Sequence, residues 1–270
     1  MRIEVNANER DAHKLASGTL KAAIEAIEVN GYVVLGGVIG FAALDGMRAK
    51  LADDTAELLR RIDRDHASHF SGHLSQPMPT SHEFIYSEVV TNPLVIQVTA
   101  AMLGAGVHNH FYNCNTNLPG SARQALHRDA PHLGRDPIHP TTSIVVNVCP
   151  IDVDELNGAT ELWPGTHRIE GGTGVTADAE AARRALTPPV RAVTVKGDVV
   201  LRDPRLWHRG MPNTTAEPRH MVAMVHSIWC YMREVAIPVT RGALHSFDDN
   251  VLRTGVALVP DEYDYLGVTY

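Results

Sequence analysis

The chain has 270 residues, of which 44% are apolar and 20% are charged, a balance typical of a globular protein that buries a sizeable core. Its net charge of -7 and its lack of a basic cluster argue against nucleic acid as a partner, because phosphate binding requires a basic patch. No window approaches the roughly 18 consecutive apolar residues of a membrane span, and residues 1–11 do not resemble a signal peptide. We therefore expect a cytoplasmic protein that acts on a small molecule.

The cysteines agree with a reducing compartment. Cys114, Cys149 and Cys230 are far apart and odd in number, so they form neither a disulfide framework nor a CxxC site. We expect them to serve as small, mostly buried apolar residues.

The first third of the chain has helical periodicity. Apolar residues recur at helical spacing over 11–30 and about 41–62, and the β-branched run 32–35 predicts a short strand between these helices. A third helix is predicted over 93–104, with Asn92 as its N-cap and a proline in its first turn.

Residues 63–82 are polar and contain His66, His69, His73 and His82. The first three histidines are spaced so that one helical face could present them to a metal ion. Ser, Gly and Pro interrupt the segment, however, and favour a solvent-facing loop or a flap over a pocket.

Beyond residue 105 short extended runs replace the helices and are separated by Gly, Pro and Asn. Eight strands are predicted, over 107–117, 125–130, 143–149, 160–163, 191–195, 198–202, 206–209 and 219–231. This pattern predicts an antiparallel barrel or a double-sheet jelly roll, with the N-terminal helices packed on one face. The fold class is therefore mainly β with α.

We find no linker-like tract and expect one domain over 1–270. It consists of a helical part over about 10–104, a β core over about 105–232 that carries a helical insert at 177–186, and a C-terminal extension over 233–270.

A metal site is predicted where the run Leu126-His127-Arg128-Asp129 is extended. Side chains alternate across a strand, so His127 and Asp129 converge on one point and Arg128 points away. The distant His208 would complete a face of two histidines and one carboxylate, which suits non-haem Fe(II) because it leaves positions open for substrate and O2.

A cosubstrate is indicated by the hairpin after His208. The chain turns through 211–215, and Arg219 begins the next strand beside the predicted ligand. A planar guanidinium holds a carboxylate through two hydrogen bonds, so a dicarboxylate could chelate the metal at one end and pair with Arg219 at the other.

The ordered set of motifs resembles the phytanoyl-CoA dioxygenase (PhyH) family. The resemblance covers roughly 20–232 and rests on His127-Arg128-Asp129, the run from Asn157-Gly158 to Pro164-Gly165-Thr166-His167, His208, and Arg219 eleven residues later. It implies a double-stranded β-helix, a jelly-roll or cupin-like barrel. It also implies an oxygenase that uses Fe(II), 2-oxoglutarate and O2, with His127, Asp129 and His208 as iron ligands and Arg219 on the far carboxylate of 2-oxoglutarate.

Two positions that could contact the cosubstrate depart from the expected pattern. Gln124 matches a position that contacts the cosubstrate in several relatives, although strand alternation points it away from His127 unless the strand bends. The family often has a hydroxyl residue two positions after the distal histidine, whereas this chain has Gly210. Thr142 is a candidate substitute.

Several other side chains have both a functional and a structural interpretation. His167 resembles a ligand, but in this family its segment is a structural turn. Trp163 is expected near the site mouth. The predicted pocket walls, which could instead be an exposed edge strand or barrel core, include Asn109, Phe111, Asn113, Asn115, Asn117, Trp229 and Tyr231.

The expected reaction is oxidation, foremost hydroxylation, of a small organic metabolite, possibly in natural-product biosynthesis. The presence of Asp129 favours this over halogenation, because related halogenases lose the carboxylate. Two alternatives stay open: a cupin-type metal enzyme that does not use 2-oxoglutarate, and a non-catalytic relative that keeps the fold for binding. The glycine-rich run 171–174 does not lie between a clear strand and helix, as a dinucleotide site requires.

Overall fold

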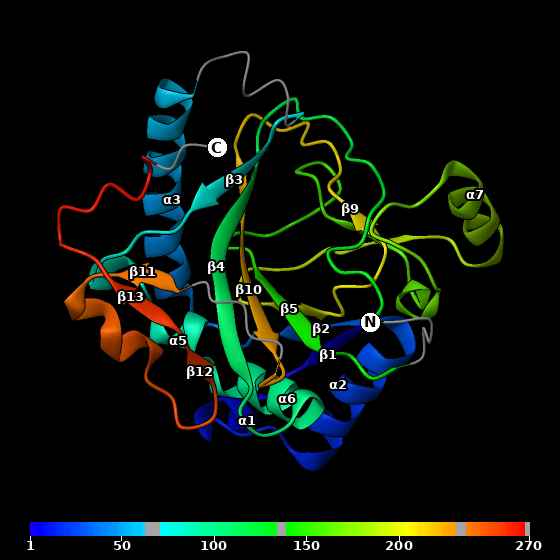
Figure 1. Cartoon of the computed structure of the whole chain (residues 1–270), viewed down its shortest axis with the longest axis horizontal. Helices are drawn as coiled ribbons and strands as arrows, with labels where there is room; N and C mark the ends of the chain where they lie inside the picture. The colour runs from blue at the N-terminus through cyan, green and yellow to red at the C-terminus, as the bar shows by residue number, and fades with distance from the viewer. Residues whose placement is uncertain (63–70, 134–138, 231–235, 268–270) are drawn as a thin grey trace.

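The computed structural model describes residues 1–62, 71–133, 139–230 and 236–267, and its centre is a large mixed β-sheet (Figure 1). The strand order is β1-β2-β8-β5-β10-β4-β12, with β3 paired to β4 as a branch. The strands are β1 (Arg2–Glu4), β2 (Tyr32–Gly36), β3 (His73–Pro77), β4 (His108–Asn117), β5 (Ser143–Val148), β8 (Val199–Arg202), β10 (Arg219–Ser227) and β12 (Arg253–Thr254). The central pairs are antiparallel.

A smaller sheet faces the main one and holds the predicted metal ligands. It consists of β7 (Val190–Arg191), β6 (Glu161–Leu162) and β9 (His208–Arg209). Isolated bridges from His127 to His208 and to Gly174 extend it by one more segment. Together the two sheets form the double-stranded β-helix, which confirms the predicted fold class.

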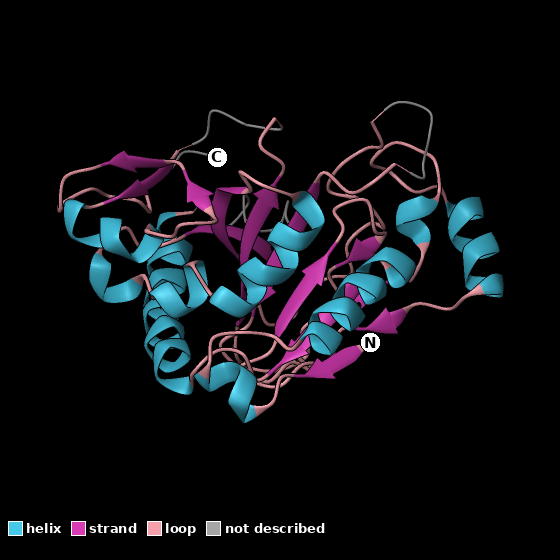
Figure 2. Cartoon of the chain, turned by 90° about the horizontal axis from the view of Figure 1, so that it is seen from below, coloured by secondary structure: helices cyan, strands magenta, loops and turns pink. Residues whose placement is uncertain are grey.

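Helices cover the other face of the main sheet, as Figure 2 shows. They are α1 (Ala7–Asp11), α2 (Ser17–Asn30), α3 (Phe41–Arg61), α5 (Ser87–Val90) and α6 (Pro93–Leu103). Apolar side chains of α2, α3 and α6 pack with the outward residues of β2, β5, β8 and β10 in one core cluster. Burial of this apolar stripe stabilises the helices more than intrinsic propensity does. Within the described residues, none of the helices has the length and apolarity that crossing a membrane requires.

The remaining elements are a helical insert, three short 3-10 helices and the C-terminal strands. α7 (Ala177–Leu186) is the predicted insert and carries no buried residue. Short 3-10 helices are η1 (His82–Phe84), η2 (Thr166–Arg168) and η3 (Arg241–Phe247). The C-terminal strands β11 (Ile237–Val239) and β13 (Val256–Leu258) pair in parallel, and β12 joins the edge of the main sheet.

The helix predicted over 11–30 begins only at Ser17 in the structure, and a separate short helix, α1, ends at Asp11. The capping box of Asn6 and Glu9 starts α1, and the Glu9 carboxylate also accepts the backbone N–H of Ala16, just before α2. His13, with a φ of 50°, reverses the chain between them. One buried carboxylate therefore fixes both helix ends, which apolar spacing alone does not reveal.

The prediction of a shared pocket face for Asn109 is wrong, because β4 contains a bulge. Opposite β10 the register shifts between Met224 and His226, so Asn109 pairs with His226 and faces the helices. Its buried amide oxygen accepts the N–H groups of Phe111 and Val225. An extra residue in one strand reverses the alternation of side chains beyond it.

The histidine-rich segment is only partly within the described residues, because His66 and His69 lie outside them. His73 begins β3, which pairs with β4, so this part of the segment is a strand and not the expected loop. The Nε2 atom of His73 lies 2.8 Å from the carbonyl oxygen of Ala122. Tyr231, predicted to line the pocket, also lies outside the described residues.

Candidate metal centre

Three side chains from distant segments converge at the small sheet. His127, Asp129 and His208 each offer a ligand atom within 4.8 Å of the other two, the only such cluster of His, Cys, Asp or Glu that the described ranges contain. Oδ1 of Asp129 lies 3.8 Å from Nε2 of His127 and 3.4 Å from Nε2 of His208. This spacing suits one divalent ion bound by two nitrogens and one oxygen.

Backbone carbonyls orient both histidines. Nδ1 of His127 lies 2.9 Å from the carbonyl oxygen of Ala125, and Nδ1 of His208 lies 2.9 Å from that of Leu206. A carbonyl oxygen only accepts, so each Nδ1 carries the proton and each Nε2 keeps a lone pair for a metal. Hydrogen bonds of this kind fix the tautomer and ring orientation of metal-binding histidines.

The carboxylate of Asp129 is oriented by Arg202 at the end of β8. Nη2 of Arg202 donates to Oδ2 of Asp129 at 2.6 Å, so Oδ1 is the oxygen that faces the histidines. Burial alone would raise the pKa of Asp129, but the charge of Arg202 and the neighbouring His208 outweigh it and hold this pKa well below its usual range. Burial, followed by the nearby His208, lowers the pKa of His127. Both shifts favour the protonation states in which these side chains bind a metal.

Arg128 points away from the cluster, as strand alternation predicted. Its guanidinium donates to the carbonyl oxygens of Ile169 and Gly172 and lies over the Trp207 ring, 5.2 Å from its centre. Arg128 thereby anchors the loop that leads to Gly174, the bridge partner of His127. The segment holding the two ligands is short, with isolated bridges only at His127 and a bend after it, instead of the predicted strand over 125–130.

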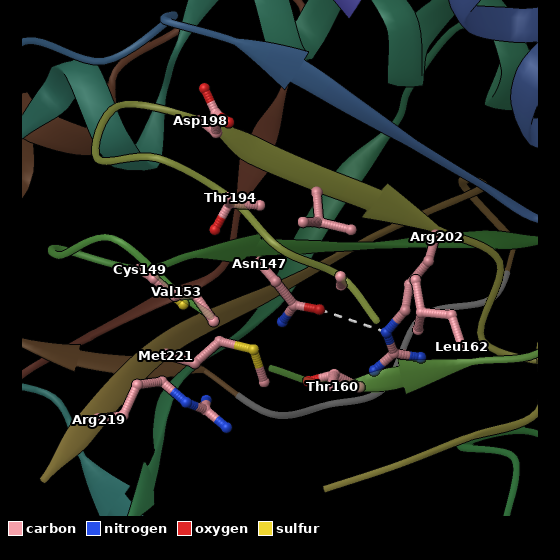
Figure 3. A pocket seen from close by; sticks show the side chains of 12 residues that line it. Asn147, Cys149, Val153, Thr160, Leu162, Thr194, Asp198, Arg202, Arg219 and Met221 are labelled. Carbon is pink, nitrogen blue, oxygen red and sulfur yellow. Dashed lines mark hydrogen bonds between the residues drawn. The ribbon is translucent and has the colours of Figure 1, made fainter. Parts of the chain in front are cut away.

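A cavity between the two sheets extends from Arg202 to Arg219 (Figure 3). Figure 3 shows these arginines at opposite ends of the lining side chains, with Met221 between them. Both are buried, with exposed fractions of 6% and 3%. The full lining consists of Asn147, Cys149, Val153, Thr160, Leu162, Ala192, Thr194, Asp198, Val200, Arg202, Arg219 and Met221.

Several buried donors around this cavity lack an acceptor. Among the described residues, Nε of Arg219, Nη1 of Arg202 and Nδ2 of Asn147 have no hydrogen-bond partner. Nη2 of Arg219 donates to the carbonyl oxygen of Gly158 at 3.0 Å. Buried donors without acceptors are costly, so the arrangement fits an anionic ligand with acceptor oxygens at both ends of the cavity.

The neighbours of Gly210 explain why this position has no side chain. A Cβ there would lie 2.6 Å from Cε1 of His73 and 2.7 Å from Oε1 of Gln124. Oε1 of Gln124 accepts the N–H of Gly210 at 2.8 Å, and the backbone N–H of Gln124 donates back to the Gly210 carbonyl oxygen. The structure therefore places Gln124 as a partner of the strand after His208, outside the residues that line the cavity.

The expected role of Thr142 beside Arg219 is wrong. The Thr142 carbonyl oxygen accepts the N–H of Ile228, at the far end of β10 from Arg219. Nine residues of extended chain separate the two ends by about 30 Å. The side chain beside Arg219 is instead Cys149, whose thiol has its pKa raised by burial and partly lowered again by Arg219.

The two tryptophans do not line the cavity. Trp163 is fully buried on the outer side of the small sheet, where it packs with Leu126 and Trp207 and donates to Glu161. Its strand neighbour Leu162 takes the inward position. Trp229 is 67% exposed, because β10 ends at Ser227 and the alternation that linked it to Arg219 ends there as well.

Asn113 and Asn115 of β4 share the face of Arg219. Asn115 lies opposite Met221 and Asn113 opposite Ala223, and directly opposed residues of an antiparallel pair point the same way. Nδ2 of Asn113 donates to Oγ of Ser75 at 2.7 Å, and Asn115 is exposed. Both lie outside the cavity lining, towards solvent.

His167 is structural. It is buried, its Nε2 lies 3.1 Å from the carbonyl oxygen of Glu28, and its ring packs where a side chain on Gly31 would be. It thus joins the turn after β6 to the end of α2, as expected for this segment.

Arg202 and Asn147 are the site residues that sequence reasoning missed. Arg202 ends a predicted strand and points inward by alternation, six residues before His208. A buried arginine at an inward position was the available signal, because such a charge requires a carboxylate or a ligand.

The fold and the site together define a metal enzyme of the double-stranded β-helix class. The chain belongs to the phytanoyl-CoA dioxygenase (PhyH) family, whose model matches residues 27–221. Among curated relatives, dioxygenase trt7 of Aspergillus terreus is 30% identical over 151 residues, which cover 53% of this chain and 49% of that protein. Dioxygenase af480 of Aspergillus fumigatus is 25% identical over 148 residues, covering 55% and 46%. The matched region spans about half the length of either relative.

Solved structures agree on the fold. The non-heme alpha-ketoglutarate-dependent carbocyclase SnoK from nogalamycin biosynthesis aligns with a TM-score of 0.57 at 16% identity, covering 80% of this chain and 85% of SnoK. AviO1 from Streptomyces viridochromogenes Tue57 aligns with a TM-score of 0.53 at 23% identity, covering 79% and 96%. At such identities the likeness concerns the fold alone.

Proposed function

We propose that this protein is a non-haem Fe(II)- and 2-oxoglutarate-dependent dioxygenase that oxidises an unactivated C–H bond of a small organic metabolite. The supporting observation is the juxtaposition of the His127, Asp129 and His208 cluster with a cavity that ends at the buried Arg219. Succinate and CO2 are the coproducts. Hydroxylation is the reaction we assign, and a natural-product intermediate is the substrate class, since SnoK, with which the fold is shared, is named from nogalamycin biosynthesis.

The residues present fit both groups. His127, Asp129 and His208 would hold Fe(II), which when bound supplies the one-electron chemistry that activates O2. Arg219 would hold the far carboxylate of 2-oxoglutarate, and its Nε, which has no hydrogen-bond partner in the described ranges, is a donor for that purpose. Leu162, Val200 and Met221 line the cavity and would exclude water from the carbon chain of the cosubstrate.

Turnover of 2-oxoglutarate tests this proposal directly. The purified protein, loaded with Fe(II) under argon and then exposed to air with 2-oxoglutarate and ascorbate, is expected to release succinate even without its substrate, at a slow uncoupled rate. Succinate release separates the proposal from a cupin-type enzyme that does not use 2-oxoglutarate. A protein that binds Fe(II) and never forms succinate, with any metabolite supplied, would contradict it.

A further inference from the structure

Arg202 has three hydrogen-bonding directions, of which two are occupied. Nη2 donates to Oδ2 of Asp129 at 2.6 Å, and Nε donates to Oδ1 of Asn147 at 3.3 Å. Nη1 has no partner among the described residues, although the side chain is buried. The guanidinium is therefore fixed in position from two sides and keeps one donor available.

The available donor belongs to a residue of the cavity wall. Arg202 and Asn147 both line the cavity, and Figure 3 shows the hydrogen bond between them at the end remote from Arg219. Because Oδ1 of Asn147 accepts from Arg202, its Nδ2 is a second donor, which also lacks a partner in the described part of the chain. Both donors are buried on the wall of one cavity, and guanidinium and amide N–H groups are the donors that carboxylate oxygens accept.

We infer that Arg202 is a positioning residue with two carboxylate partners: the metal ligand Asp129 and, through Nη1, the oxo-acid carboxylate of the bound cosubstrate. Asn147 is its second donor. This inference rests on the proposed function. It places an arginine at each end of the dicarboxylate, with Arg219 on the far carboxylate and Arg202 beside the metal.

A direct consequence is coupling between metal and cosubstrate. The guanidinium that orients Asp129 is also the one that receives the ligand, so a bound ligand restrains Arg202 and, through it, the metal-binding carboxylate. Metal should therefore bind more tightly in the presence of 2-oxoglutarate, by more than direct chelation provides. An arginine that merely balances the charge of Asp129 would affect metal binding alone.

Ligands that lack one carboxylate identify the end that each arginine contacts. Dissociation constants are measured by isothermal titration calorimetry on Mn(II)-loaded protein with 2-oxoglutarate and with 2-oxobutyrate, which keeps the oxo-acid end and lacks the far carboxylate. Arg219→Ala is expected to weaken the binding of 2-oxoglutarate only. Arg202→Gln is expected to weaken both ligands by the same factor, on the order of ten-fold or more.

The conservative variant separates the two partners of Arg202. A lysine can hold Asp129 but cannot direct a second fixed donor into the cavity. Arg202→Lys is therefore expected to bind Mn(II) more tightly than Arg202→Gln does. Its affinity for 2-oxoglutarate and 2-oxobutyrate should stay as low as that of Arg202→Gln. Arg209→Lys is the matched control, because Arg209 is also buried and pairs with carboxylates, Glu161 and Glu180, on the opposite face of the small sheet.

The outcomes distinguish this inference from the proposed function. A wild-type protein that binds neither Mn(II) nor 2-oxoglutarate would refute both. The wild-type protein could instead bind 2-oxoglutarate with an affinity that Arg219→Ala weakens and that Arg202→Gln changes by less than about two-fold. That result would overturn only the role of Arg202. A crystal structure of the wild-type protein with Mn(II) and 2-oxoglutarate needs no variant: Nη1 of Arg202 within hydrogen-bond distance of the oxo-acid carboxylate supports the inference, and any other position overturns it.

Discussion

Arg202 donates from Nη2 to Oδ2 of Asp129 at 2.6 Å, so the carboxylate that faces His127 and His208 is held from behind by a buried guanidinium. This contact explains why Oδ1 is the oxygen nearest the histidines and why the pKa of Asp129 is low. A ligand carboxylate that is oriented and ionised before the metal arrives requires little reorganisation on binding.

Asp129→Asn is expected to abolish tight metal binding, because it removes the one negative ligand and leaves Arg202 facing a neutral amide. Affinity for Fe(II) or Mn(II) should fall by about a hundred-fold or more. Calorimetric titration with Mn(II) measures this loss. Asp154→Asn, in a surface loop, serves as the control, and an Asp129→Asn protein with wild-type affinity would show that the metal lies elsewhere.

Arg128→Ala should leave metal content unchanged and lower stability. The guanidinium donates to carbonyl oxygens in the 169–172 loop and lies over Trp207, so its removal leaves buried acceptors unpaired. The free energy of unfolding should fall by about 2–4 kcal/mol. Urea denaturation and metal analysis test the two halves of the prediction, with the exposed Arg184→Ala as control. Loss of metal without loss of stability would mean that Arg128 faces the site.

Gly210→Ser, which introduces the hydroxyl residue common in the family, should destabilise this protein. The new Cβ would contact Cε1 of His73 and Oε1 of Gln124. We expect a loss of about 1–3 kcal/mol, relieved in part by a second change, His73→Ala. Thermal unfolding measures both. Gly172→Ser is the matched control, because its Cβ would have no neighbour within 4 Å. Equal effects of the two serines would contradict the steric explanation.

Two buried histidines predict acid sensitivity. Burial lowers the pKa of His226 to about 3 and that of His220 to about 4. An unfolded histidine titrates near pH 6.5, so below that pH the unfolded chain binds more protons and the folded state loses stability as pH falls. Each histidine contributes roughly 1.4 kcal/mol per pH unit between its folded and unfolded pKa values.

Urea midpoints between pH 7.5 and 5 measure this dependence. In His226→Gln the loss of stability per pH unit should be smaller than in the wild-type protein, even if the variant is less stable throughout. The exposed His245→Gln serves as a control for replacing a histidine. An unchanged slope in His226→Gln would mean that His226 is protonated in the folded state.

The main elements of the fold could be predicted from periodicity, and the exceptions have physical reasons. Strands β4, β5, β8 and β10 fall within their predicted ranges, and each contributes apolar side chains to the core beneath the helices. The bulge that reverses Asn109 depends on pairing with β10, which a single strand's pattern cannot reveal. The same holds for Trp229, whose predicted orientation required β10 to continue past Ser227.

The site, like the fold, could be predicted from the sequence only in part. Local alternation of side chains predicted that His127 and Asp129 converge, and the order of the motifs predicted that His208 joins them. In the structure all three lie in one cluster. Arg202 and Asn147 could not be paired from the sequence, because their hydrogen bond depends on the register of β5 against β8. Thr142 failed for the same reason, since its distance from Arg219 is set by the register of β5 against β10.

We propose that Fe(II) and 2-oxoglutarate bind together at this site, and an anaerobic absorption titration tests this most directly. Protein loaded with Fe(II) is titrated with 2-oxoglutarate and monitored for the visible metal-to-ligand charge-transfer band of the chelate. We predict a saturable band in the wild-type protein, a titration shifted to concentrations about ten-fold or more higher in Arg219→Ala, and no band in Asp129→Asn. Absence of the band in the wild-type protein, or the same titration curve in Arg219→Ala, would contradict the account.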